Sequence, residues 1–336
     1  MMQAAIYGLE GLALKEDERA FFLDAEPAGF ILFRRNCENQ EQLLRLTDSL
    51  RSIAGRDDVP ILIDQEGGRV ARMRPPEWPA FPAAEKFANL YRAAPSSAIE
   101  AVRANARALA LMLRSVGVNV NALPLLDVRQ EGATDIIGDR ALGSEPMQVA
   151  ALGRAVLDGM ASAGVIGIVK HMPGHGRALV DSHKELPIVT ASAEELEIDL
   201  EPFERLAAAP MGMTAHVVYT AWDDQRPASL SPVVIRDIIR ERIGFDGLLM
   251  SDDLGMEALK GDFASRARDV VAAGCDLVLH CSGKMDEMIA VASAVPALSN
   301  EGHDRLTRAM AGSRIDLDSV DFAEEISKRD QLLALA

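Results

Sequence analysis

Short apolar runs recur along the chain, and each is followed by a polar loop and then by a segment with helical periodicity. The runs are rich in β-branched residues and too short for helices, which is typical of buried strands. Eight of them occur, within residues 4–7, 29–33, 60–64, 118–126, 164–169, 211–217, 247–251 and 275–279. This alternation predicts parallel βαβ units, and the count of eight favours a single (β/α)8 TIM barrel over residues 1–336.

Several polar patterns indicate where helices begin and end. Two capping boxes, Ser97-x-x-Glu100 and Ser192-x-x-Glu195, each predict a helix start, and the first helix should end at Gly117. Further helices are expected over residues 41–53, 146–163 and from Ser231-Pro232 to Gly244. After the seventh strand, we expect Asp253 to cap a short helix over residues 254–259.

A doubly wound open sheet is the alternative fold, but it would require a G-x-G-x-x-G turn after the first strand. Tyr7-Gly-Leu-Glu-Gly11 does not fit that motif. In a barrel, active sites collect at the C-terminal ends of the strands. The polar residues predicted at those ends are Asp64, Arg72, Asp127, Arg140, Lys170, His171, His216 and Asp252.

Composition narrows the class of protein. The net charge of −16 argues against nucleic acid or an anionic membrane as a partner. No run of about eighteen apolar residues occurs, and the N-terminus lacks the basic region of a signal peptide. The three cysteines are odd in number and have no metal-ligand spacing, which fits a reducing cytoplasm.

Proton-handling side chains are densest in residues 170–183, KHMPGHGRALVDSH. Lys170 and His171 should lie at the end of the fifth strand, and the Pro-Gly-x-Gly segment after them predicts a loop able to move. His171 and His175 have an i, i+4 spacing, but the proline and glycine between them forbid the helix that would align two metal ligands. We therefore expect neither a metal nor another cofactor.

Two acidic segments are expected to supply further functional side chains near this loop. Asp252 shares a strand face with Leu248 and Met250, which directs it to the barrel mouth. Asp64 ends another strand, and a carboxylate suits adjacent sugar hydroxyls because it accepts two hydrogen bonds at once. Arg72, Arg140 and Lys170 would add donors, completing a site for a polyol or an anion. Glu66 and Arg69, in the turn after Asp64, could instead form a structural salt bridge.

Asp181 precedes His183 by two residues and could orient its ring and support its protonated form. A histidine with a pKa near 6.5 can donate and accept a proton at neutral pH. A carboxylate nucleophile, a proton shuttle and hydroxyl-binding groups are together what retaining glycosyl transfer requires. Histidine here takes the place of the usual second carboxylate.

Five motifs together resemble the β-N-acetylglucosaminidases (β-hexosaminidases) of glycoside hydrolase family 3, specifically the single-domain bacterial type of peptidoglycan recycling. They are Asp64-x-Glu-Gly-Gly-Arg-Val-x-Arg72, Gly138-Asp-Arg140, Lys170-His-x-Pro-Gly-His-Gly176, Asp181-Ser-His183 and Ser251-Asp252. The resemblance implies that Asp252 is the nucleophile and that His183, supported by Asp181, is the acid/base. It also implies that the terminal N-acetylglucosamine is bound by Asp64, Arg72, Arg140, Lys170 and His171.

The same resemblance implies an enzyme with a TIM-barrel fold and no metal. The enzyme would act in the cytoplasm on muropeptide fragments that carry 1,6-anhydro-N-acetylmuramic acid. We expect a monomer. Two alternatives stay open. A neutral histidine in place of a carboxylate would not repel phosphate, so the protein could be a phosphorylase. It could also be a catalytically silent sugar-binding barrel, although the intact Asp252 and His183 argue against this.

Overall fold

The computed structural model describes residues 1–130, 132–133, 135–180, 182, 185–313 and 321–335. Within them, eight parallel strands close into a barrel in the order β1-β2-β3-β4-β5-β7-β10-β11. Their bounds are β1 Gln3–Gly8, β2 Pro27–Leu32, β3 Ile61–Ile63, β4 Val120–Asn121, β5 Ile166–Met172, β7 Met211–Thr214, β10 Leu248–Asp253 and β11 Leu277–His280. The predicted (β/α)8 barrel is confirmed.

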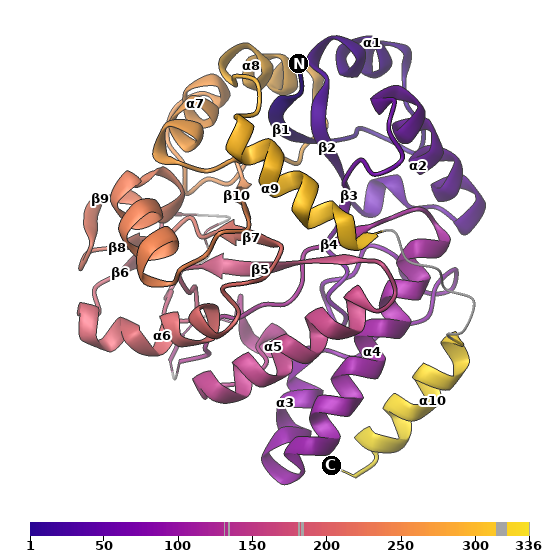
Figure 1. Ribbon diagram of the computed structural model, residues 1–336, viewed down its shortest axis with the longest axis vertical. Helices are drawn as coiled ribbons and strands as arrows, with labels where there is room; N and C mark the ends of the chain where they lie inside the picture. The colour runs from indigo at the N-terminus through magenta and orange to yellow at the C-terminus, as the bar shows by residue number, and fades with distance from the viewer. Residues whose placement is uncertain (131, 134, 181, 183–184, 314–320, 336) are drawn as a thin grey trace.

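The helices form a layer around these strands (Figure 1). They are α1 Glu16–Ala25, α2 Gln40–Ala54, α3 Ala84–Ala93, α4 Pro95–Ser115, α5 Pro146–Ala161, α6 Ala193–Arg205, a π-helix Val234–Arg242, α7 Phe263–Ala273, α8 Met285–Ala294, α9 Asn300–Met310 and α10 Phe322–Leu333. Short 3-10 turns include Arg34–Asn36 and Gly138–Arg140. A small sheet joins β6 Ile188–Val189, β8 Val218–Tyr219 and β9 Asp223–Pro227 outside the barrel.

The fourth strand is much shorter than the apolar run that predicted it. Only Val120 and Asn121 pair with both neighbouring strands. The run is interrupted at Pro124, which has no N–H to donate to a ladder. The chain beyond it rejoins β5 through the carbonyl of Lys170, which accepts from the N–H of Leu126 at 2.7 Å. This second contact places Asp127 at the end of the barrel.

The two predicted capping boxes have opposite outcomes. At Ser192 the prediction is confirmed, because its Oγ accepts from the N–H of Glu195 and the Glu195 carboxylate accepts in return from the N–H of Ser192. The box at Ser97 is wrong: α4 begins at Pro95 with no side-chain cap. The ring of a proline at the first helical position fixes the φ angle at a helical value, and proline has no N–H that a cap would satisfy. The preceding helix α3 was not predicted at all.

The expected helix after Asp253 is also absent, and residues 254–259 form turns instead. The next helix, α7, begins at Phe263, where Asp262 accepts from the N–H of Ser265 at 2.8 Å. Asp253 instead accepts from the N–H groups of Gly255 and Cys281, at 3.0 and 3.1 Å. It therefore ties the end of β10 to the end of β11.

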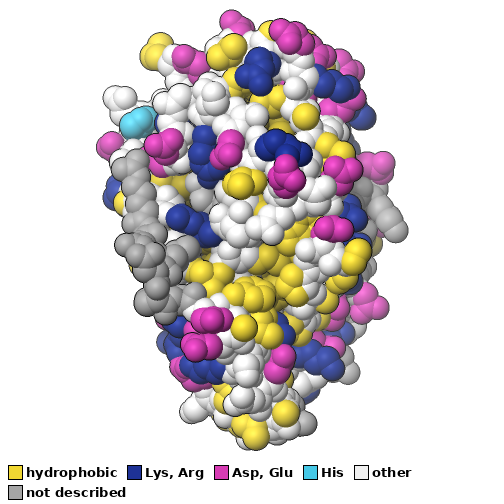
Figure 2. All heavy atoms as spheres, turned by 90° about the vertical axis from the view of Figure 1, so that its right-hand side faces the viewer, with side chains coloured by type: hydrophobic (Ala, Val, Ile, Leu, Met, Phe, Trp, Pro, Cys, Tyr) yellow, Lys and Arg dark blue, Asp and Glu magenta, His cyan; other side chains and the backbone are white. Residues whose placement is uncertain are grey.

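On one face of the molecule the charged side chains do not form large segregated patches. Figure 2 shows acidic and basic side chains interspersed there, with hydrophobic side chains gathered across the middle. Within the part of the chain described, no helix combines the length and the apolarity needed to cross a membrane. The three cysteines are free and buried.

Candidate active site

A cavity of about 300 Å³ lies among the C-terminal ends of the barrel strands. Six residues singled out from the sequence line it together: Asp64, Arg72, Arg140, Lys170, His171 and Asp252. They come from β5, from β10 and from the loops that follow β3 and β4. Asp181 and His183 fall outside the described residues, but Ser182, which lies between them in the sequence, also lines the cavity.

One wall of the cavity is a chain of alternating charges. Asp64 accepts from Arg72 Nη2 at 3.0 Å through one oxygen and from Lys170 Nζ at 3.1 Å through the other. Lys170 Nζ also lies 2.8 Å from Glu66 Oε1. Arg140 donates from Nε and Nη2 to the two oxygens of Glu66, at 2.8 Å each. Five ionic side chains are thus fixed in one row.

The opposite charges within this row keep its acidic and basic side chains ionised. Burial alone would raise the pKa of Asp64, but Lys170 and Arg72 outweigh it and hold that pKa well below its usual range. The pKa of Glu66 is likewise lowered by Lys170 and Arg140 against the effect of burial. Burial would lower the pKa of Lys170, yet Glu66 and Asp64 raise it. The row is therefore ionised at neutral pH and offers both donors and acceptors to a ligand.

The salt bridge between Glu66 and Arg69, which the sequence left open, is not formed. Arg69 reaches across the mouth to Asp139, with Nε and Oδ1 2.7 Å apart. Glu66 instead turns inward to Arg140 and Lys170 and becomes part of the cavity wall. A signal for this was present, because Glu66 is two residues beyond Asp64 at the end of a strand, where alternate residues share a face.

Asp127 organises the two histidines of the next strand. It is fully buried, and its Oδ2 lies 2.8 Å from His171 Nδ1 while its Oδ1 accepts from the N–H of His175 at 2.7 Å. Since a carboxylate only accepts, Nδ1 of His171 carries the proton and Nε2 is left for a ligand. Burial would raise the pKa of Asp127, but His171 outweighs it and holds the pKa at about 2. The sequence placed Asp127 at a strand end without assigning it this role.

Asp252 lies at the end of β10 and lines the cavity as predicted. One of its oxygens accepts from the N–H of Asp253 at 2.8 Å. Burial would raise its pKa, but His171 and His216 outweigh burial and lower it. His216 lies behind the strand end, where Nε2 is 3.0 Å from the carbonyl oxygen of Asp253. Asp252 is therefore an ionised carboxylate on a supported strand end, which is suitable for a nucleophile.

The glycines after Lys170 are packed closely against neighbouring segments. A Cβ at Gly176 would lie 1.9 Å from the carbonyl oxygen of Val128, and one at Gly174 would lie 2.9 Å from the Asp199 side chain. Residues 173–176 are buried. Close packing therefore also requires these glycines.

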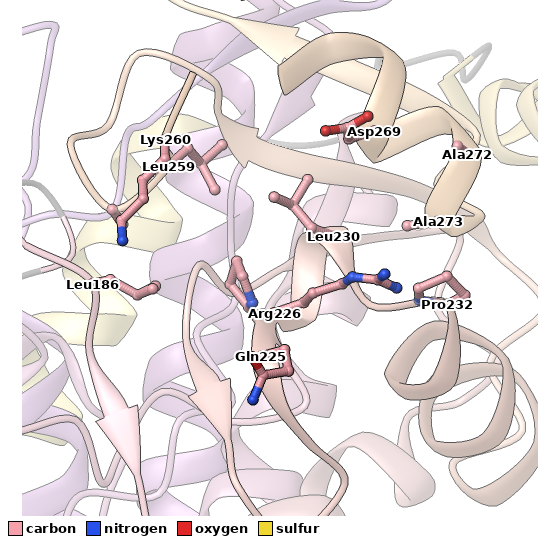
Figure 3. A pocket seen from close by; sticks show the side chains of 12 residues that line it. Leu186, Gln225, Arg226, Leu230, Pro232, Leu259, Lys260, Asp269, Ala272 and Ala273 are labelled. Atoms are coloured by element: carbon pink, nitrogen blue, oxygen red, sulfur yellow. The ribbon is translucent and has the colours of Figure 1, made fainter. Parts of the chain in front are cut away.

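A second and larger cavity, of about 500 Å³, lies between β9, the turns after β10 and helix α7. Figure 3 shows Arg226 and Lys260 approaching it from two sides, with Asp269 on α7. Among the described residues that line it, Asp269 is the one acid and histidine does not occur. It lacks the paired groups that acid/base chemistry needs, so the smaller cavity is the candidate active site.

The sequence and the fold of the chain are similar to those of known proteins. Residues 1–310 match the glycosyl hydrolase family 3 N-terminal domain. The chain belongs to this family. A β-hexosaminidase from Methylococcus capsulatus is 39% identical to it over 330 residues, which is 95% of each chain. The predicted family and the predicted class of enzyme, a glycoside hydrolase, are confirmed, and the phosphorylase alternative receives no support from these relatives.

Solved structures of family 3 relatives agree with the whole fold. NagZ from Neisseria gonorrhoeae, in complex with N-trifluoroacetyl-D-glucosamine, is 31% identical with a TM-score of 0.86 and covers 100% of this chain and 98% of its own. A β-N-acetylglucosaminidase from Paenibacillus sp. str. FPU-7 is 30% identical with a TM-score of 0.86 and covers 98% of this chain and 66% of its own. Among the residues that the structure describes, no cluster of three metal-binding side chains occurs.

Proposed function

We propose that the protein is a retaining exo-β-N-acetylglucosaminidase that removes the non-reducing terminal N-acetylglucosamine from β-1,4-linked muropeptide fragments. The fragments would carry 1,6-anhydro-N-acetylmuramic acid, with or without peptide. The observation that carries this proposal is the meeting of ionised Asp252 with the Asp64–Lys170–Glu66 row in one cavity. The N-acylated glucosamine in the complex of the Neisseria gonorrhoeae relative supports the class of sugar.

The row of charges provides the sugar-binding half of the site. Each oxygen of Asp64 uses one lone pair on a cation and keeps another for a sugar hydroxyl. Arg72 and Arg140 have further N–H groups, and His171 Nε2 is left by its bond to Asp127. These side chains are already held in position, so a sugar would be bound without first ordering them.

In the proposed reaction, Asp252 attacks the anomeric carbon while the glycosidic C–O bond breaks. His183, supported by Asp181, gives its proton to the departing oxygen, and a glycosyl ester with Asp252 remains. His183 then takes a proton from water, whose oxygen attacks the anomeric carbon and releases the Asp252 carboxylate. Two displacements at one carbon retain its configuration.

We also propose that this enzyme works in the cytoplasm and as a monomer. The cytoplasmic assignment is supported by three cysteines that are odd in number, buried and unpaired. The monomer is supported by the five ionic side chains of the binding row, which satisfy one another's charges within the chain.

Product analysis tests the proposed function. The enzyme should release free N-acetylglucosamine from N-acetylglucosaminyl-1,6-anhydro-N-acetylmuramic acid, both with and without its peptide, and from an aryl β-N-acetylglucosaminide. Release of N-acetylglucosamine 1-phosphate in phosphate buffer would show a phosphorylase instead. Binding of the sugar without any product would show a silent sugar-binding barrel.

A further inference from the structure

Phe33 is the residue that follows strand β2, and it lines the active-site cavity. Strands β2 and β3 pair in parallel with Leu32 opposite Ile63, so the next residues along the two strands, Phe33 and Asp64, follow at the same level of the barrel. The side chain is half-buried and packs against the hydrophobic core. The proposed reaction uses no aromatic ring at this place, so the role of this one is unassigned.

A buried asparagine holds the backbone of Phe33. The N–H of Phe33 donates to Asn36 Oδ1, and its carbonyl oxygen accepts from the N–H of Asn36, at 2.8 Å each. Asn36 is fully buried, and its Nδ2 donates to the carbonyl oxygens of Leu9 and Gly11 at 3.2 and 2.7 Å. The segment after β1 therefore fixes where the Phe33 side chain begins.

Two arginines lie over the Phe33 ring. Arg72 Cζ is 5.1 Å from the ring centroid, and Arg35 Cζ is 4.9 Å from it. A guanidinium within about 6 Å of the centroid is attracted by the negative face of an aromatic ring. Arg35 depends less on this attraction, because it also donates to the carbonyl oxygens of Leu9, at 2.7 Å, and of Cys281.

The guanidinium of Arg72 has fewer polar contacts. Its Nη2 donates to Asp64 at 3.0 Å, and within the described part of the chain this is its one hydrogen bond. Its Nε is buried and has no hydrogen-bond partner among the described residues. A planar group held by one hydrogen bond can still turn about it, whereas a guanidinium stacked on an aromatic face has a defined plane. The Phe33 ring therefore supplies the second constraint on Arg72.

We propose that Phe33 is a positioning residue that orients the Arg72 guanidinium for the terminal sugar through a cation–π contact. The ring sets the plane of the guanidinium, and Asp64 sets the place of one nitrogen, so the other N–H groups are presented to the ligand in one arrangement. This inference rests on the proposed function, in which Arg72 binds the terminal N-acetylglucosamine. It assigns Phe33 a role in the affinity for the sugar and none in breaking the glycosidic bond.

The first test measures binding of N-acetylglucosamine by isothermal titration calorimetry. Phe33→Leu keeps an apolar side chain but removes the aromatic face, and it should raise Kd about three- to thirtyfold, the size of one cation–π contact. KM for an aryl β-N-acetylglucosaminide should rise in the same range, with kcat changed by less than about threefold, because binding rather than the chemical step is affected. Phe33→Tyr keeps the face and should stay within about twofold of the wild type.

Phe263 provides the matched control. It is also half-buried, and Arg266 Cζ lies 5.4 Å from its ring centroid, but it is not among the described residues that line the active-site cavity. Phe263→Leu should therefore leave both Kd and KM unchanged. A double-mutant cycle separates the orientation of Arg72 from simple packing. In an Arg72→Met background, Phe33→Leu should cause little further loss of affinity, because the group that it orients is already gone.

Replacing Phe33 with trifluorophenylalanine keeps the aromatic ring and weakens its negative face, so this protein decides the question even if Phe33→Leu does not fold. It should raise Kd, by less than Phe33→Leu does. Unchanged affinity with the fluorinated ring, or losses from Phe33→Leu and Arg72→Met that add in full, would overturn the positioning role and leave the proposed function standing. Binding by Arg72→Met as tight as that of the wild type would overturn both the positioning role and the proposed sugar-binding role of Arg72.

Discussion

At the scale of single residues, the site consists of side chains whose charges are set by one another. Lys170 is 2% exposed and contacts both Asp64 and Glu66, so neither carboxylate can be changed without affecting a buried cation. Removing one partner of such a pair leaves the other charge uncompensated, which is more costly than the pair is worth. A substitution at any of these residues is therefore expected to affect binding and local order together.

Asp64→Asn tests the binding role at this scale. The amide keeps the shape of the side chain but loses the charge that holds Lys170 and accepts from sugar hydroxyls. Loss of a charged hydrogen bond costs about 1.5–3 kcal/mol, so kcat/KM should fall by roughly ten- to a hundredfold. Steady-state kinetics on an aryl β-N-acetylglucosaminide measure this. Asp304→Asn, exposed on α9, is the control, and unchanged kinetics for Asp64→Asn would place Asp64 outside the sugar site.

At the scale of elements, the sequence predicted strands better than it predicted helix starts. A buried strand needs only a short β-branched run, and each such run did supply a barrel strand. The start of a helix depends on which of several local signals is used. Helix α4 begins at Pro95. The Glu100 carboxylate accepts from Arg103 and Lys328 instead of capping the helix. Asp253 likewise found partners on β11, which is distant in the sequence.

The dependence on partners that are distant in the sequence also explains which residues of the candidate site could be predicted. Asp64, Lys170 and Asp252 end strands, and the fold brings all strand ends to one face, so the sequence was enough to place them. Glu66 and Asp127 work through partners that are distant in the sequence, Arg140 in a 3-10 turn and His171 on β5, and no local pattern encodes those distances. The positions of Asp181 and His183 lie outside the described residues, and their roles stay predictions.

At the scale of the whole molecule, the protonation of buried His175 affects how the stability of the fold depends on pH. An unfolded histidine takes up a proton near pH 6.5, whereas burial and His171 lower the pKa of His175 to about 4 in the folded protein. The unfolded state then binds more protons between these values, so this residue makes the fold less stable as pH falls through that window. Asp199 acts in the opposite direction, because burial raises its pKa to about 6.

His175→Gln isolates the contribution of the histidine, since Asp199 is the same in both proteins. The wild type should lose more of its Tm than the variant does between pH 6.5 and pH 4, and above pH 7 the difference between the two should be constant. Thermal unfolding followed by circular dichroism across this range is the measurement. Parallel curves for the two proteins over the whole range would show that His175 is not held neutral by the fold.

The central claim for the whole enzyme is a covalent intermediate on Asp252, and trapping that intermediate tests it most directly. A 5-fluoro N-acetylglucosaminyl fluoride should form the glycosyl-enzyme and slow its hydrolysis, so that digestion and mass spectrometry find the added sugar on the peptide containing Asp252. Asp252→Asn should remain unlabelled, and the first product seen by NMR with a natural substrate should be the β-anomer. A label on Asp253 or Glu66, or an α-anomer formed first, would contradict the account.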